Sequence, residues 1–125
     1  MRLLPLLALA TACAATEAGP SGGAEAGLDR ELAGRTAGEP RDCVPASPGA
    51  NLVPRGKQAV VLDQGGTIWV SRLAAPCPGL DAWSTIVIDV HNGQYCRGDR
   101  FRTVAAGQSV AGPICVLGDF TPYRR

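Results

Sequence analysis

Asp89 and His91 are the residues of this chain whose types and spacing come closest to acid–base chemistry. A carboxylate that orients an imidazole is a recurring acid–base device, and residues two apart on a strand share a face. Ser84 and Thr85 lie near in sequence as nucleophiles, but the sequence does not place either against His91. A solvated polar strand face is the commoner arrangement. We therefore expect a protein that is not an enzyme, with a weak hydrolase using Asp89 and His91 as an alternative.

Cysteine is the second source of chemistry, and the five cysteines divide into one and four. Cys13 ends an apolar N-terminal run. The others are spread through the rest of the chain, at Cys43, Cys77, Cys96 and Cys115. No Cys-x-x-Cys pair occurs and His91 is the only histidine, so zinc-type spacing is absent and we predict neither a metal nor a cofactor. An even set of four suits two disulfides, and the spacing leaves all three pairings open.

Charge offers a third candidate, because Arg97, Arg100 and Arg102 surround Asp99. This group is either a functional charge cluster or, more commonly, a solvated strand edge with weak ion pairs. Residues 43–125 hold eight Lys and Arg against five Asp, an excess of three positive charges. That excess is too mild to indicate nucleic acid, and no Gly-x-x-x-x-Gly-Lys phosphate loop occurs.

The N-terminus is typical of an export signal. Residues 1–12 combine a basic Arg2, a short apolar run and small residues, which predicts a secretory signal peptide. Ala10-Thr11-Ala12-Cys13 resembles a bacterial lipobox, with Ala10 where such motifs usually carry Leu. We expect lipidation of Cys13. The same residues satisfy the small-x-small rule of ordinary cleavage, so plain secretion is the alternative.

Export implies an oxidising compartment, where disulfides persist. Ala14 follows Cys13 instead of the aspartate that typically retains bacterial lipoproteins at the inner membrane. We therefore expect the periplasmic face of the outer membrane, or alternatively a soluble periplasmic or secreted protein. The expected partners are the membrane, through the anchor on Cys13, and an unknown envelope protein or ligand.

Residues 13–42 are predicted to be a disordered tether. The segment is rich in Ala, Gly and Glu and has no aromatic residue, so it cannot bury enough apolar surface to offset the entropy of ordering. As a flexible coil its ends would lie about 30 Å apart. Within it, 28–34 has two leucines and is a candidate for a weak helical turn or for docking on the domain.

Residues 43–125 are predicted to form one small β domain. Short apolar or alternating runs separated by turn residues indicate strands at 58–63, 67–72, 84–91, 99–105 and 114–117. Gly65-Gly66 and Asn92-Gly93 are hairpin signals, and 107–113 is a loop. Since no helical periodicity follows Cys43, we expect a small antiparallel β barrel or sandwich.

Side-chain alternation predicts the faces of two of these strands. Ile86, Ile88 and Val90 point one way and Thr85, Val87, Asp89 and His91 the other, while Phe101 and Thr103 oppose Arg100 and Arg102. All six aromatic residues lie in this domain: Trp69, Trp83, Tyr95, Phe101, Phe120 and Tyr123. They either fill a small core, which is the commoner use, or form a binding patch.

A resemblance rests on several short segments. These are Leu32-Ala33-Gly34-Arg35-Thr36-Ala37-Gly38-Glu39-Pro40, Cys77-Pro78-Gly79-Leu80, Cys96-Arg97-Gly98-Asp99, and Cys115-Val116-Leu117-Gly118-Asp119-Phe120-Thr121-Pro122-Tyr123. Together with the signal-and-Cys start, they resemble a family of small exported, lipoprotein-like proteobacterial (sphingomonad-type) proteins classed as a domain of unknown function. The resemblance covers roughly 32–123 and supports export and a β fold. It transfers no catalytic residue.

The resemblance also implies a disulfide pairing. Proteins of this layout can lack the second and fourth of the four cysteines together while they keep the first and third. This favours Cys43–Cys96 and Cys77–Cys115 over the alternative of Cys43–Cys115 with Cys77–Cys96.

Taken together, these features predict an exported, non-enzymatic, lipid-anchored binding or structural module. A second expectation is a secreted inhibitor of an envelope hydrolase, because small disulfide-linked domains often present rigid loops. The loop at 107–113 is the candidate for that role.

Overall fold

The computed structural model describes residues 22–125. Within this part the chain forms the helix α1 (Gly22–Leu32) and ten short strands in three antiparallel sheets. The first sheet has five strands, which are in spatial order β1 (Thr36–Ala37), β10 (Phe120–Arg124), β5 (Thr67–Arg72), β4 (Ala59–Gln64) and β3 (Val53–Pro54). The second sheet pairs β2 (Cys43–Pro45) with β7 (Gln94–Cys96). The third sheet has the order β6 (Thr85–Ile88), β8 (Arg100–Val104) and β9 (Cys115–Val116). The predicted signal peptide at 1–12, Cys13 and the first part of the tether lie outside the described residues.

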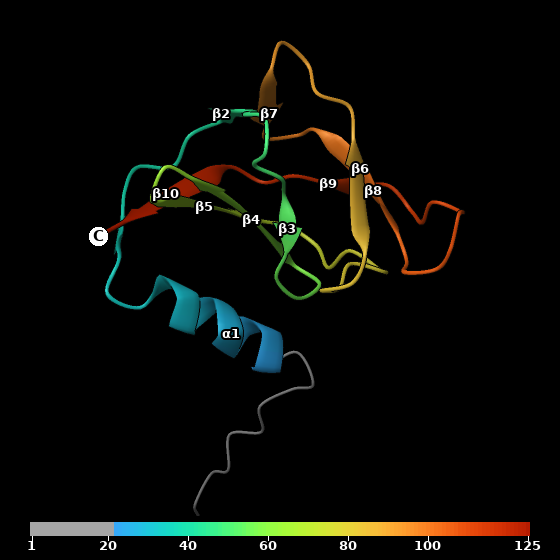
Figure 1. Cartoon of the computed structure of the whole chain (residues 1–125), viewed down its shortest axis with the longest axis horizontal. Coiled ribbons are helices and arrows are strands. Elements are labelled where there is room, and N and C mark those ends of the chain that lie inside the picture. Colours follow the sequence, from blue (N-terminus) through green and yellow to red (C-terminus); the bar gives the residue numbers. More distant parts are fainter. Residues whose placement is uncertain (1–21) are drawn as a thin grey trace, which may run out of the picture.

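The sheets are layered around one main core. Helix α1 lies against one face of the five-stranded sheet, and the two smaller sheets lie against the opposite face of that sheet (Figure 1). The main core joins side chains of all three sheets, among them Leu62, Phe120, Val44 and Phe101. The predicted mainly β, antiparallel fold with two disulfides is confirmed, and the strands pack as separate sheets without closing into a barrel.

The hairpin of β4 and β5 is built as its sequence predicts. Gly65 and Gly66 connect the strands with φ angles of 57° and 84°, and Gln64 pairs with Thr67. Positive φ at both central residues is the requirement of the two-residue turn that matches the twist of a hairpin. Both faces of these strands are covered, which explains why Val60, Val61 and Leu62 are all buried in succession.

Helix α1 is a docked element. Leu28 and Leu32 are four residues apart and therefore share one helix face. Both are buried, in a cluster with Val61, Ile68 and Val70 on the second face of the sheet. The cluster removes from water an apolar surface that the sheet would otherwise expose.

The segment after the helix is also held. Arg35 Nη1 donates to Gly66 O at 2.7 Å, β1 pairs with β10, and Arg41 and Phe120 exchange two backbone hydrogen bonds of 2.8 Å. The prediction that 13–42 is a disordered tether therefore needs correction from Leu28 onward, in favour of docking, because the strands of the domain supply the partners that composition does not reveal. The folded unit begins well before Cys43.

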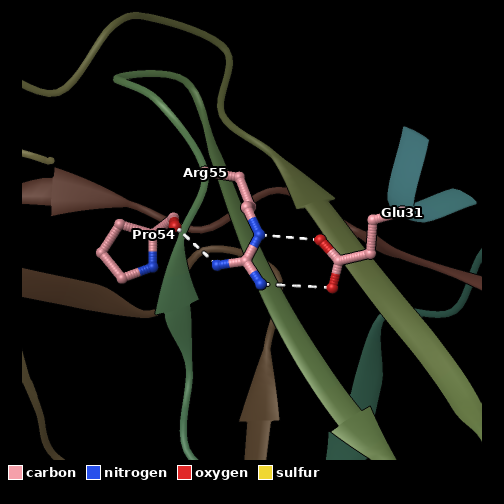
Figure 2. A network of polar contacts seen from close by, with 3 residues as sticks. All are labelled: Glu31, Pro54 and Arg55. Carbon is pink, nitrogen blue, oxygen red and sulfur yellow. Dashed lines mark hydrogen bonds and ion pairs between the residues drawn. The ribbon is translucent and has the colours of Figure 1, made fainter. Parts of the chain in front are cut away.

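An ion pair joins α1 to the turn before β4. Arg55 Nε and Nη2 donate to the two carboxylate oxygens of Glu31 at 2.7 and 3.2 Å, and Nη1 donates to Pro54 O at 3.0 Å (Figure 2). Both side chains are half-buried. Such a pair contributes about 0.2–1 kcal/mol. The ion pair therefore orients the helix, and the burial of Leu28 and Leu32 attaches it to the sheet. No helix in the described part of the chain has the length and apolar character needed to cross a membrane.

Leu28→Ala tests the docking of α1. We expect the free energy of unfolding to fall by about 2–3 kcal/mol, because a buried leucine is truncated and the site cannot fully collapse. Urea unfolding of the whole chain measures this. Asp29→Ala, at an exposed position of the same helix, should change the free energy by less than about 0.5 kcal/mol. Equal, small effects for both variants would contradict a docked helix.

The two disulfides are Cys43–Cys96 and Cys77–Cys115, the pairing that the resemblance favours. Cys43 and Cys96 stand directly opposite each other on β2 and β7. The second bridge ties the loop after β5 to β9, and both of its sulfur-bearing residues are buried in the main core.

The predicted strand at 84–91 is shorter than expected. The Asn92-Gly93 turn forms, with φ angles of 55° and 69°, and a single bridge joins His91 to Gln94 across it. The two arms then separate: β6 pairs with β8, and β7 pairs with β2. The turn prediction is confirmed, and the chain leaves this turn into two different sheets.

Candidate functional site

Asp89 and His91 are not brought together as an acid–base pair. Both are exposed, at the end of β6 and at the Asn92-Gly93 turn, and within 22–125 no hydrogen bond joins their side chains. Ser84 is buried and its Oγ donates to Asp81 O at 2.9 Å. Its hydroxyl is thus part of a turn, and this geometry does not assemble a nucleophile with a base.

The cysteines are structural in this part of the chain. The four in the domain are bonded in pairs. Across the described residues, no group of three or more His, Cys, Asp or Glu side chains is placed to hold a metal ion.

Asp99 organises a turn. Its Oδ2 accepts a hydrogen bond from the Cys96 N–H at 2.8 Å, and its own N–H donates to Cys96 O at 3.0 Å. The Glu31–Arg55 ion pair involves none of the three arginines around Asp99. Arg97, Arg100 and Arg102 are therefore exposed without a carboxylate partner. The predicted charge cluster resolves into a turn-forming aspartate and three unpaired cations.

The strand register gathers two of these cations with apolar side chains on one surface. Val87 pairs with Arg102 across β6 and β8, and Arg100 pairs with Val116 across β8 and β9. Residues paired across antiparallel strands share a face, and continuing the β8–β9 register places Ile114 beside Arg102. We call this surface the arginine face; its members are Val87, Arg100, Arg102, Ile114 and Val116. Its three apolar side chains are about half exposed: 52% for Val87, 50% for Ile114 and 48% for Val116.

The alternation predicted for β6 and β8 is confirmed within the two strands; Val90, predicted to face the same way as Ile86 and Ile88, lies beyond the end of β6 and is exposed. Phe101 and Thr103 are buried and their neighbours Arg100 and Arg102 are exposed, while Ile86 and Ile88 pack on the core. The arginine face is thus the outer side of strands whose inner side builds the core. Its backbone geometry is held by residues that cannot move without disturbing that core.

Trp83 stands at one end of this sheet and is 81% exposed. Asp81 holds it there, because its Oδ1 accepts from the Trp83 N–H at 2.8 Å and its carbonyl accepts from the Ser84 N–H. Thr85 pairs with Val104, so the start of β6 and the loop 105–113 lie at the same end of the sheet. Exposed Val110 belongs to that loop.

The other aromatic residues are structural. Trp69, Tyr95, Phe101 and Phe120 are buried in the main core, and Tyr123 packs on the cluster beneath α1. The guanidinium carbons of Arg41 and Arg124 lie 5.5 and 5.7 Å from the centre of the Trp69 ring, within cation–π range. Core filling therefore accounts for these five, and Trp83 is the exception.

A groove borders the arginine face along β9. It has a volume of ≈ 610 Å³ and lies between β9 and the loop after β5. Its apolar lining includes Pro76, Pro78, Ile114 and Val116, and its charged lining residues are Arg72, Arg97 and Asp119. We call it the β9 groove. Because Ile114 and Val116 belong to both, the groove and the arginine face form one continuous surface.

Comparison of the chain with protein-family models, with curated proteins and with solved structures found no match. The resemblance to small exported proteobacterial proteins thus stays a prediction from the sequence.

Proposed function

We propose that this chain is an exported, non-enzymatic binding module of the bacterial cell envelope. The observation that carries the proposal is the arginine face, where two unpaired guanidinium groups stand among half-exposed Val and Ile side chains. Contiguous exposed apolar surface is a feature of interaction sites on small proteins, and Arg is enriched at the centres of interfaces. A partner would cover the apolar groups and satisfy the cations.

The two disulfides support the export part of the proposal, since such bridges persist in oxidising compartments. We propose that Cys13 carries the lipid anchor at the periplasmic face of the outer membrane. The intact mass of the chain purified from membranes would then show an acylated Cys13 as its first residue. Cys13→Ser should move the protein to the soluble fraction, and an unacylated mature chain would favour the soluble periplasmic or secreted alternative.

The secreted inhibitor is a second candidate, favoured by the loop 105–113, which contains the predicted loop at 107–113. Its base is fixed, because Gly112 N–H donates to Thr103 O at 2.8 Å and the adjoining Cys115 is bridged to Cys77. Val110 projects from it with 77% of its surface exposed. Inhibition of purified envelope hydrolases that is lost in Val110→Asp would support this role.

The binding proposal is tested by retention of envelope components on the immobilised, oxidised chain. We expect Arg100→Glu combined with Arg102→Glu to lower the amount of a specific component at least tenfold, because both complementary charges are reversed. Arg125→Glu, at the exposed C-terminus, is the matched control and should retain it. If nothing binds, or if the double variant retains the same set, the binding proposal fails.

A further inference from the structure

The two most exposed large apolar side chains of the described residues lie at one end of the third sheet. Trp83 is 81% exposed and Val110 is 77% exposed. Trp83 precedes the start of β6, and the loop 105–113 follows the end of β8, which is paired with that start. This loop projects beyond the sheets at one end of the molecule (Figure 1). We call this surface the apolar tip; its members, all exposed, are Ala82, Trp83, Ala105, Ala106, Val110 and Ala111.

The apolar tip is almost free of charge. The sequence has no Asp, Glu, Lys, Arg or His from residue 103 to 118, and Asp81 is the single charged residue from 73 to 88. The Oδ1 of Asp81 already accepts a hydrogen bond from the Trp83 N–H at 2.8 Å. A partner of the tip is therefore held by apolar contact and not by charge, in contrast to a partner of the arginine face.

Both parts of the tip are fixed to the fold. The hydrogen-bonded turn before β6 holds Trp83. In the loop, Gln108 N–H donates to Ala105 O at 3.0 Å and Gly112 N–H donates to Thr103 O at 2.8 Å. A surface that is already ordered loses little conformational entropy when it is covered, so more of the gain from burying its apolar side chains is retained.

The docking of α1 brings this end of the molecule within reach of the anchor proposed at Cys13. The helix starts at Gly22 and is attached to the sheet through Leu28, so the eight residues 14–21 separate it from Cys13. Such a spacer spans at most about 30 Å at full extension. The N-terminal end of α1 points toward the end of the molecule that carries the tip (Figure 1). An acyl group on Cys13 would therefore present the tip to the bilayer at a high effective concentration.

We propose that the apolar tip docks in the headgroup interface of the bilayer that holds the Cys13 anchor. Trp83 and Val110 enter the boundary between headgroups and acyl chains, a depth at which tryptophan is enriched. The loop backbone stays among hydrated headgroups, because irregular backbone is not tolerated in the hydrocarbon region. This inference rests on the anchor in the proposed function. It adds a lipid surface as a second partner, at a site distinct from the arginine face.

Docking of the tip leaves the arginine face open. Arg102 and Arg100 lie two and four residues back from Val104, the last residue of β8, or about 7 and 14 Å along the strand. Since β6 and β8 end at the tip, they run away from the bilayer surface. Their outer side then faces neighbouring envelope components, as the proposed binding function requires.

The test uses the oxidised chain from Cys13 onward, which contains every described residue, coupled through Cys13 to a maleimide lipid in phosphatidylcholine vesicles. The other four cysteines are bonded in pairs and do not react. We expect bromine atoms on the acyl chains to quench Trp83 fluorescence, and aqueous acrylamide to quench it less than in solution. Trp69 is buried in the main core, and Trp83→Phe identifies the signal of Trp83. Raised salt should change the bromine quenching by less than about twofold, because the tip has no cation to be screened.

Variants separate docking of the tip from anchoring alone. Val110→Asp puts a charge into the tip and should lower the bromine quenching about tenfold, whereas Val53→Asp, at an exposed valine of another sheet, should change it by less than about twofold. Asp81→Asn keeps the acceptor of the turn and removes the charge, so its quenching should be at least as strong. Arg100→Glu with Arg102→Glu should be quenched like the unchanged chain, because the tip and not the arginine face contacts lipid.

Several results would overturn the inference. These are equal acrylamide access to Trp83 on vesicles and in solution, equal losses in Val110→Asp and Val53→Asp, an unacylated Cys13 in the mature chain, and protection of Trp83 by soluble peptidoglycan fragments without vesicles. If docking fails while retention of an envelope component still depends on Arg100 and Arg102, the membrane inference alone is wrong. Loss of that retention with docking intact removes the binding proposal and leaves the lipid-docking tip.

Discussion

Replacement of Cys77 and Cys115 together by alanine is expected to lower the free energy of unfolding by about 4 kcal/mol or more. The bridge closes a loop with a sequence separation of 38 residues, for which the chain-entropy model gives roughly 4 kcal/mol. Both residues are also buried in the main core, so their truncation removes packing in addition. Domains of this size are stable by about 5–15 kcal/mol in total, and the variant should be close to unfolded at 37 °C.

The matched control is Cys43→Ala with Cys96→Ala. This bridge spans 53 residues and gives a similar entropic contribution, but both cysteines are only partly buried. We expect urea unfolding under oxidising conditions to rank the Cys77–Cys115 variant as the less stable of the two. The reverse order, or a loss below about 1 kcal/mol for Cys77–Cys115, would contradict the assignment of this bridge to the core.

Gly118→Ala is the second change for which we expect a large effect. Gly118 lies where the chain passes from β9 to β10, and a Cβ built there would overlap the carbonyl oxygen of Arg72. The carbonyl of Arg72 belongs to the backbone and cannot rotate away. The segment between β9 and β10 must therefore shift, which weakens the hydrogen bond from Ser71 Oγ to Gly118 O. We expect a loss of about 2–4 kcal/mol in the free energy of unfolding.

Gly27→Ala is the matched control for the glycine prediction. Gly27 lies within α1, and a Cβ there would meet no atom within 4 Å. Alanine should stabilise the helix by about 0.5–1 kcal/mol, so the two Gly→Ala variants should move the unfolding midpoint in opposite directions. Equal shifts in urea or thermal unfolding would show that Gly118 is not at a close approach.

The sequence predicted elements whose signals are local. The strand at 67–72 is found with the same bounds, and 58–63 and 99–105 are found within one residue at each end. In each case a β-rich run is bounded by Gly or another turn residue, and the pattern needs no knowledge of a distant partner.

The short strands with proline were missed, because proline reads as a strand breaker. Pro122 lies in β10, between β1 and β5. Gly38 N–H donates to Pro122 O at 2.7 Å. The hydrogen bond that the proline nitrogen cannot donate in return would go to the carbonyl of Gly38, just beyond the end of β1. The strand therefore tolerates proline, for a reason visible only once β1 is in place.

Only part of the arginine face could be predicted from the sequence. Alternation along β8 placed Arg100 and Arg102 on the outer side of their strand. It could not place Ile114 and Val116 beside them, because that depends on the register across the loop 105–113. The docking of α1 could not be predicted for a similar reason. Two leucines in an Ala- and Gly-rich segment do not show that a sheet face is available to bury them.

The central claim, that the arginine face meets a partner in the envelope, is tested most directly by photo-crosslinking in cells. A photoreactive amino acid at Val87 should yield a discrete crosslinked product, and Arg100→Glu with Arg102→Glu should abolish it. The same group at Val53, an exposed valine of the five-stranded sheet, should not yield that product. The absence of any product from Val87, or identical products from both positions, would contradict the account.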